Sequence, residues 1–137
     1  MDFRVWALLS AFFAGLTALL AKKGVEGVPS NLALAARVLV IFVFVIGLAF
    51  ATGQTSIREL TARNWTFLAL SGLATGASWL FYFRAIQAGP ISQVAPIDKL
   101  SFVIAAVLGF VFLREKLTAN LAIGIALIVA GVLVTLR

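Results

Sequence analysis

Hydrophobic residues along this chain occur in five blocks of about 20 residues, separated by short polar segments. The blocks cover residues 4–21, 32–52, 64–84, 91–113 and 118–136. A helix of about 20 apolar residues crosses a hydrocarbon core of about 30 Å, because each residue adds about 1.5 Å. The pattern therefore predicts an all-α membrane protein with five transmembrane helices.

The connecting segments are too short to form a water-soluble domain. They cover residues 22–31, 53–63, 85–90 and 114–117, and glycine or proline interrupts the first three. Of the 137 residues, 63% are hydrophobic and 12% are charged, whereas soluble domains carry about 25% charged residues. The first block is long for the apolar core of a signal peptide, and further blocks follow it. We therefore interpret it as the first transmembrane helix.

The sequence contains no cysteine and no histidine, which removes disulfides, thiolate chemistry and the most common metal ligand. It also lacks a nucleophile–base set, paired carboxylates and a phosphate-binding loop. We therefore expect no enzyme activity, no metal and no cofactor. The net charge is +6, but the basic residues lie mostly at the ends of apolar blocks, where they meet lipid headgroups. The expected partner is a lipid bilayer and not a nucleic acid.

Basic residues are nearly balanced between the two membrane faces. With five spans, five basic residues fall on one face and six on the other. The positive-inside rule needs an imbalance to set orientation, so this balance favours insertion in both orientations. Two oppositely inserted copies would form a ten-span inverted repeat, which is a common architecture for alternating access. The alternative is a single orientation set by the order of insertion.

The fourth block is the most informative about activity, because two charges interrupt its apolar run. If a helix begins at Ile91, Asp98 lies about 10 Å into it, and Lys99 follows directly. A charge at that depth is costly in lipid, so it should face protein, water or a ligand. Pro96 cannot donate a hydrogen bond to the carbonyl of Ser92 and therefore predicts a kink. The alternative is that Pro96 only shapes the first turns of the helix.

Asp98 and Lys99 are neighbours, so on a regular helix their side chains point about 100° apart. Arg37 in the second block and Arg84 at the end of the third fall on the same membrane side, and both are candidate partners of Asp98. The pair could be structural, fixing helix packing, or it could shift partners during transport. These four charges sum to +2, which favours an anionic or zwitterionic cargo.

The third block has a polar stripe at helical spacing. Its members are Ser71, Thr75, Ser78 and Tyr82, with Trp79 beside them. Thr17 belongs to a similar line of small residues in the first block. Such residues either allow close helix packing or line a pathway, and both interpretations stay open. Two glycine pairs, Gly72 with Gly76 and Gly124 with Gly131, predict packing seams.

Several short motifs, in this order, resemble the EamA domain of the drug/metabolite transporter superfamily. They are Lys22-Lys23-Gly24, Arg37, Tyr82-Phe-Arg-Ala85, Val94-Ala-Pro-Ile97, Glu115-Lys-Leu117, and Gly124 with Gly131. The resemblance covers essentially the whole chain. One departure is Asp98-Lys99-Leu-Ser, where many two-domain members are more apolar.

The resemblance implies a single EamA-like transmembrane domain over residues 1–137, equivalent to half of a ten-helix transporter. It implies a multi-pass protein of a prokaryotic inner membrane that carries a small polar or amphipathic metabolite by alternating access. A single domain implies a homodimer, antiparallel if both orientations insert. Spans one, three and four would then face a central cavity. Other functions remain open: an ion channel, an accessory subunit, or a subunit of a lipid-linked-sugar flippase.

Overall fold

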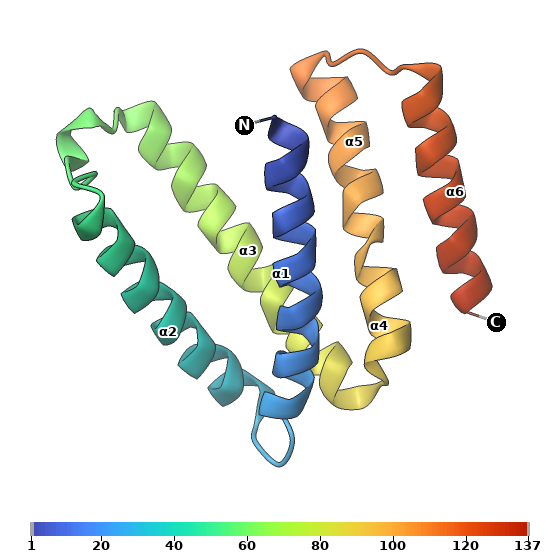
Figure 1. The fold of residues 1–137 in the computed structure, drawn as a ribbon, viewed down its shortest axis with the longest axis horizontal. Helices are drawn as coiled ribbons and strands as arrows, with labels where there is room; N and C mark the ends of the chain where they lie inside the picture. Colours follow the sequence, from blue (N-terminus) through green and yellow to red (C-terminus); the bar gives the residue numbers. More distant parts are fainter. Residues whose placement is uncertain (1, 137) are drawn as a thin grey trace. The chain divides into compact units, whose positions relative to one another are not determined.

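The computed structural model of the chain describes residues 2–136, and its regular elements within that range are all helical. They are α1 (Phe3–Gly24), α2 (Ser30–Ala51), the short 3₁₀ helix η1 (Ile57–Glu59), α3 (Ala62–Ala88), α4 (Ile91–Asp98), α5 (Leu100–Leu113) and α6 (Ala119–Thr135). Figure 1 shows their order. Four segments are long and apolar enough to cross a membrane, and α6 is a shorter apolar helix. The predicted all-α membrane fold is confirmed.

The helices form two compact units, which we describe separately. One unit covers Leu19–Ala88 and contains the last turn of α1 with the antiparallel pair α2 and α3. Apart from Arg37 and the first turn, the helix α2 is apolar on all sides, as expected for a span in contact with lipid. It begins after Pro29 and ends before Gly53, whose φ of +70° is a left-handed conformation that glycine adopts readily.

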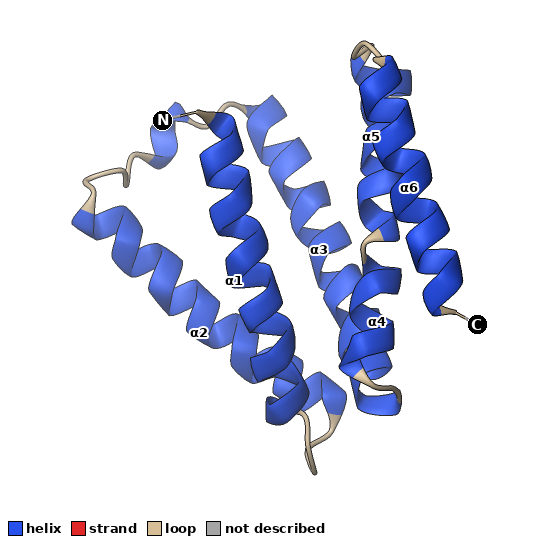
Figure 2. Ribbon diagram, turned by 45° about the vertical axis from the view of Figure 1, so that its right-hand side comes forward, coloured by secondary structure: helices blue, strands red, loops and turns tan. Residues whose placement is uncertain are grey.

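The other unit combines the chain up to Ala18 with the chain from Gly89 onwards, and in it α4, α5 and α6 pack together. The fourth span is not one helix, since α4 ends at Asp98 and α5 begins at Leu100. Figure 2 shows the non-helical segment between them. The amide of Lys99 donates to the carbonyl of Pro96, and the amide of Phe102 donates to that of Lys99, both at 3.1 Å. These three-residue spacings are tighter than α-helical ones and mark the interruption.

The sequence predicts a kink at Pro96, and the interruption lies just after this residue. Proline lacks the amide hydrogen of a regular helix and its ring crowds the preceding turn. The helix tolerates Pro96 within α4 and then tightens at Lys99, where φ and ψ are −68° and −10°. The two charged residues therefore sit at the discontinuity itself.

The third helix continues past residue 84 to Ala88, so Arg84 lies inside α3 and not at its end as predicted. The fourth span covers the predicted range, Ile91–Leu113, with the interruption described above. The fifth span is α6, whose 17 residues reach about 26 Å, close to the minimum for crossing the hydrocarbon core. Its start is as expected, because the Thr118 side chain accepts a hydrogen bond from the amide of Leu121 at 3.3 Å.

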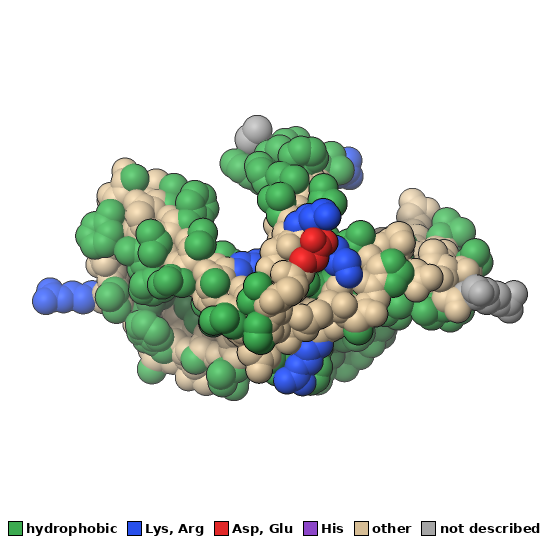
Figure 3. Space-filling view, turned by 90° about the horizontal axis from the view of Figure 1, so that it is seen from below, with side chains coloured by type: hydrophobic (Ala, Val, Ile, Leu, Met, Phe, Trp, Pro, Cys, Tyr) green, Lys and Arg blue, Asp and Glu red, His purple; other side chains and the backbone are tan. Residues whose placement is uncertain are grey.

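The glycine pairs of α3 and α6 that were predicted to pack against other helices have open space beside them. A Cβ atom built on Gly72, Gly76, Gly124 or Gly131 would meet nothing within 4 Å. Gly109 differs, because the side-chain Oε2 of Glu115 would lie 2.8 Å from such an atom. Hydrophobic side chains cover most of the surface seen in Figure 3, as expected for a chain that faces lipid.

Candidate functional site

Arg37 projects from α2 onto two aromatic rings of α3. Its guanidinium carbon lies 4.5 Å from the centroid of the Trp79 ring and 5.5 Å from that of Phe83. The two rings are four residues apart, so they occupy one face of α3. A guanidinium over an aromatic face is attracted by the ring quadrupole, and the attraction grows when water is excluded. The α2–α3 pair thus holds a half-buried cation at a defined place within a membrane span.

The polar stripe of α3 lies beside these rings, because Tyr82 is three residues from Trp79 on the same helix. Tyr82 is half-buried, whereas Ser71, Thr75 and Ser78 are exposed. The hydroxyl of Thr75 donates to the carbonyl of Ser71 at 2.9 Å. This hydroxyl is therefore satisfied by its own helix, as is common for threonine in membrane helices.

Two side-chain hydrogen bonds connect the C-terminal end of α3 to the α1–α2 region. The ammonium of Lys22 donates to the carbonyl of Ile86 at 2.6 Å, and the side-chain amide of Gln87 donates to the carbonyl of Val28 at 2.8 Å. The last carbonyls of a helix lack intrahelical partners and carry partial negative charge, so a lysine is well suited to bind them. Val25 and Ile86 are buried beside these contacts.

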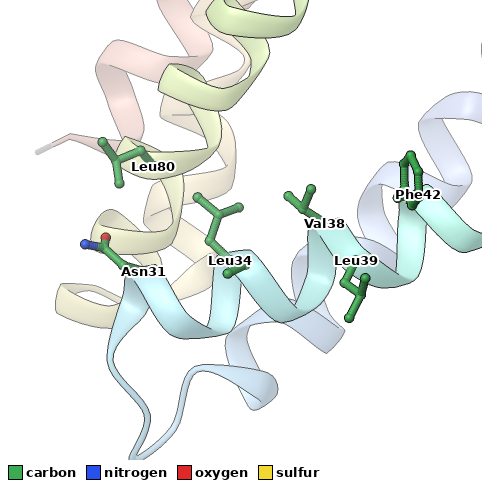
Figure 4. A pocket seen from close by; sticks show the side chains of 7 residues that line it. Asn31, Leu34, Val38, Leu39, Phe42 and Leu80 are labelled. Atoms are coloured by element: carbon green, nitrogen blue, oxygen red, sulfur yellow. The ribbon is translucent and has the colours of Figure 1, made fainter.

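An apolar groove of about 560 Å³ runs along α2 and is closed on one side by Leu80 of α3. Asn31, Leu34, Val38 and Phe42 line it at helical spacing (Figure 4). Asn31 is its polar end. An open groove of this kind suits an apolar group or a lipid chain, with polar contacts only at one end.

In the other unit, Asp98 and Lys99 form a loose ion pair at the interruption of the fourth span. The carboxylate Oδ2 and the ammonium Nζ are 3.8 Å apart, with side-chain exposures of 38% and 60%. The regular-helix expectation placed these side chains about 100° apart, but the tightened backbone and the long lysine stem bring the charges together. Lys99 and Pro96 also line a groove of about 570 Å³ against α6.

The structure therefore brings some of the predicted site residues together and leaves the others separate. Arg37, Trp79 and Tyr82 come together on α2 and α3, whereas Asp98 with Lys99 forms a separate pair in the other unit. Thr17 also belongs to that other unit, and Arg84 is an exposed residue of α3. The pairing of Asp98 with Arg37 or Arg84 stays a prediction.

Sequence reasoning missed three contributors. Phe83 is the second ring beneath Arg37, and the Trp79-x-x-x-Phe83 spacing could have revealed it, because residues four apart share a helix face. Lys22 and Gln87 act across 64 and 59 residues of sequence. No local pattern marks such long-range contacts.

The chemistry available in these sites is binding and not bond making. Within the described residues, no group of three or more acidic, histidine or cysteine side chains could hold a metal ion. The groups present are cations, hydroxyls, aromatic rings and one acid. They can recognise charge and shape, and they can change partners when helices move.

Comparisons with known proteins agree with this chemistry. Residues 4–137 match the model of the EamA-like transporter family. The chain is similar to a Sinorhizobium protein described as an uncharacterized transporter in the cobO 3′ region, with 50% identity over 133 residues, or 96% of this chain and 94% of that protein. No solved structure matches the chain. The chain belongs to the EamA-like transporter family and is a multi-pass membrane transporter, not an enzyme.

Proposed function

We propose that this chain is a secondary carrier that moves a small polar or amphipathic metabolite across a prokaryotic inner membrane by alternating access. The observation that carries the proposal is the interrupted fourth span, with Asp98 and Lys99 at its break, in a member of a transporter family. Interrupted helices serve as binding and gating elements in carriers, because their free backbone ends and charges can exchange partners.

In this proposal the chain is one EamA-like domain and works as an antiparallel homodimer with the pathway between the two copies. Two observations support it: the balanced basic residues and the glycine faces of α3 and α6, which are open in the structure. Small residues at such faces allow close approach of another membrane helix.

Carrier activity is tested with the purified chain in proteoliposomes. Uptake of labelled amino acids and organic acids should saturate with concentration and should be stimulated by the same compound on the other side. Ohmic currents far above carrier turnover would instead identify an ion channel. The variant Asp98→Asn should alter the uptake rate or its pH dependence, with Glu26→Gln in the α1–α2 loop as the control. If Asp98→Asn changes neither, Asp98 has no coupling role.

The antiparallel arrangement is tested by single cysteines, because the native chain has none. Glu26→Cys and Ser56→Cys place one thiol in each of two consecutive loops, on opposite membrane faces. An impermeant maleimide applied to intact spheroplasts should label a fraction of both variants. Labelling of one position only would show a single orientation in the membrane and would contradict the antiparallel dimer.

A further inference from the structure

Arg37 is a cation held inside a membrane span with its hydrogen-bonding edge unused. It lies about 10 Å along α2 from the first residue of the helix, Ser30. Trp79 and Phe83 contact its guanidinium through their rings. The rings attract the charge but contain no oxygen that accepts a hydrogen bond from its five N–H donors. These aromatic contacts therefore leave the donors without an oxygen acceptor.

The unit that contains Arg37 offers it no counter-charge. Within the described residues Leu19–Ala88, no oxygen accepts a hydrogen bond from this guanidinium. The acids of this unit are Glu26, which pairs with Lys23 at 3.3 Å, and Glu59, which lies in η1 beyond the far end of α2. An unpaired charge in a span is costly, so such groups mark ligand or ion pathways.

The surroundings favour an anion over any other ligand. The same unit contains six basic and two acidic side chains, so its field is positive. Tyr82, three residues after Trp79 on the same face of α3, adds a polar side chain beside the aromatic partners of the arginine. Arginine binds carboxylate and phosphate groups through two parallel N–H bonds, which gives both strength and geometry.

We propose that Arg37, oriented by Trp79 and Phe83, binds the oxyanion group of an organic anion that this transporter carries. The site takes a carboxylate, phosphonate or phosphate attached to a small organic body. This inference rests on the proposed carrier function and adds the charge of its substrate. The aromatic rings hold the cation in place, so binding does not require Arg37 to lose much conformational freedom.

The test uses Trp79 as the reporter. The chain has three tryptophans, and Trp6→Phe with Trp65→Phe leaves Trp79 alone. The purified protein, in detergent without lipid, is titrated with four probes that share one ring: benzoate, phenylphosphonate, benzyl alcohol and benzylammonium. Benzoate and phenylphosphonate should change Trp79 fluorescence saturably and bind at least about tenfold more tightly than the other two. Equal binding of benzyl alcohol or benzylammonium overturns the proposal.

Variants separate a binding role from a structural one. Arg37→Gln should weaken benzoate binding by about tenfold or more, and Arg37→Lys should be intermediate, because it keeps the charge but loses the planar fork. Arg63→Gln is the matched control, because this exposed arginine of α3 also lies over a ring, 5.9 Å from the centroid of Phe67, and it should change the affinity less than about twofold. An unchanged affinity in Arg37→Gln, or equal losses in both glutamine variants, overturns the proposal. If Arg37→Gln does not fold, the proposal is tested by the preference of the protein with Arg37 for benzoate and phenylphosphonate over benzyl alcohol and benzylammonium.

A lipid phosphate is the competing source of the same oxyanion chemistry. Phosphatidylglycerol is therefore added to the detergent-solubilised protein as a competitor. If this lipid changes Trp79 fluorescence while benzoate and phenylphosphonate do not, Arg37 is a lipid site and the substrate assignment is overturned. Transport is measured separately. If anions bind but their uptake is not stimulated, the proposed carrier function is rejected and the anion site is retained. If benzylammonium is taken up selectively, the anion site is rejected and the carrier function is retained.

Discussion

The contact between Lys22 and Ile86 should make a measurable contribution to stability, and its neighbour Lys23 provides the control. Lys22 donates from the last turn of α1 to a carbonyl in the last turn of α3, at 2.6 Å. Lys23 instead pairs with Glu26 at 3.3 Å, with both side chains more than half exposed. The substitutions Lys22→Met and Lys23→Met remove the same charge from adjacent positions.

The expected magnitudes differ because the two environments differ. A hydrogen bond from a charged donor contributes about 1.5–3 kcal/mol in proteins, and a cation at a helix C-terminus adds about 0.5 kcal/mol. Hydrogen bonds between membrane helices average only about 0.6 kcal/mol, which lowers the expectation. We therefore expect Lys22→Met to cost about 1.5 kcal/mol. Lys23→Met should cost about 0.5 kcal/mol or less, because exposed ion pairs are weak.

The measurement is the free energy of unfolding in mixed micelles, with increasing sodium dodecyl sulfate and tryptophan fluorescence as the signal. Helix content by circular dichroism before the transition confirms that both variants begin from the same fold. A loss in Lys22→Met that matches the loss in Lys23→Met would refute the reasoning, since the specific carbonyl contact would then contribute nothing beyond charge.

Three further variants test local features by the same unfolding measurement. Trp79→Leu removes a ring beneath Arg37 and should cost about 1–2 kcal/mol; a loss below 0.3 kcal/mol would show that the stack adds no stability. Arg114 has a φ of 55°, so Arg114→Gly should gain up to about 1 kcal/mol and Arg114→Val should lose stability, and the reverse order would contradict the left-handed cap. Gly53→Ala should cost about 1 kcal/mol because its φ is +70°, whereas Gly47→Ala, inside α2 with open space around it, should be neutral or stabilising.

The sequence was sufficient for the spans and for part of the site. Apolar block length predicted the helices, and Gly53 lies in a connection that glycine was expected to interrupt. Proline and two charges marked the fourth span as irregular. The position of the break at Lys99 could not be predicted, because it depends on which backbone hydrogen bonds the folded chain retains after Pro96.

What the sequence determined by itself is the class of molecule: a bundle of membrane helices with isolated charges, no cysteine or histidine, and the pattern of a transporter family. The spacing of apolar residues and the length of apolar blocks depend only on residues close together in the chain, so the sequence alone predicts the helices. The tertiary structure decided which groups meet. It placed Arg37 on Trp79 and Phe83, and Lys22 on the end of α3. These partners are distant in sequence, and only the packing of the helices brings their side chains within contact distance.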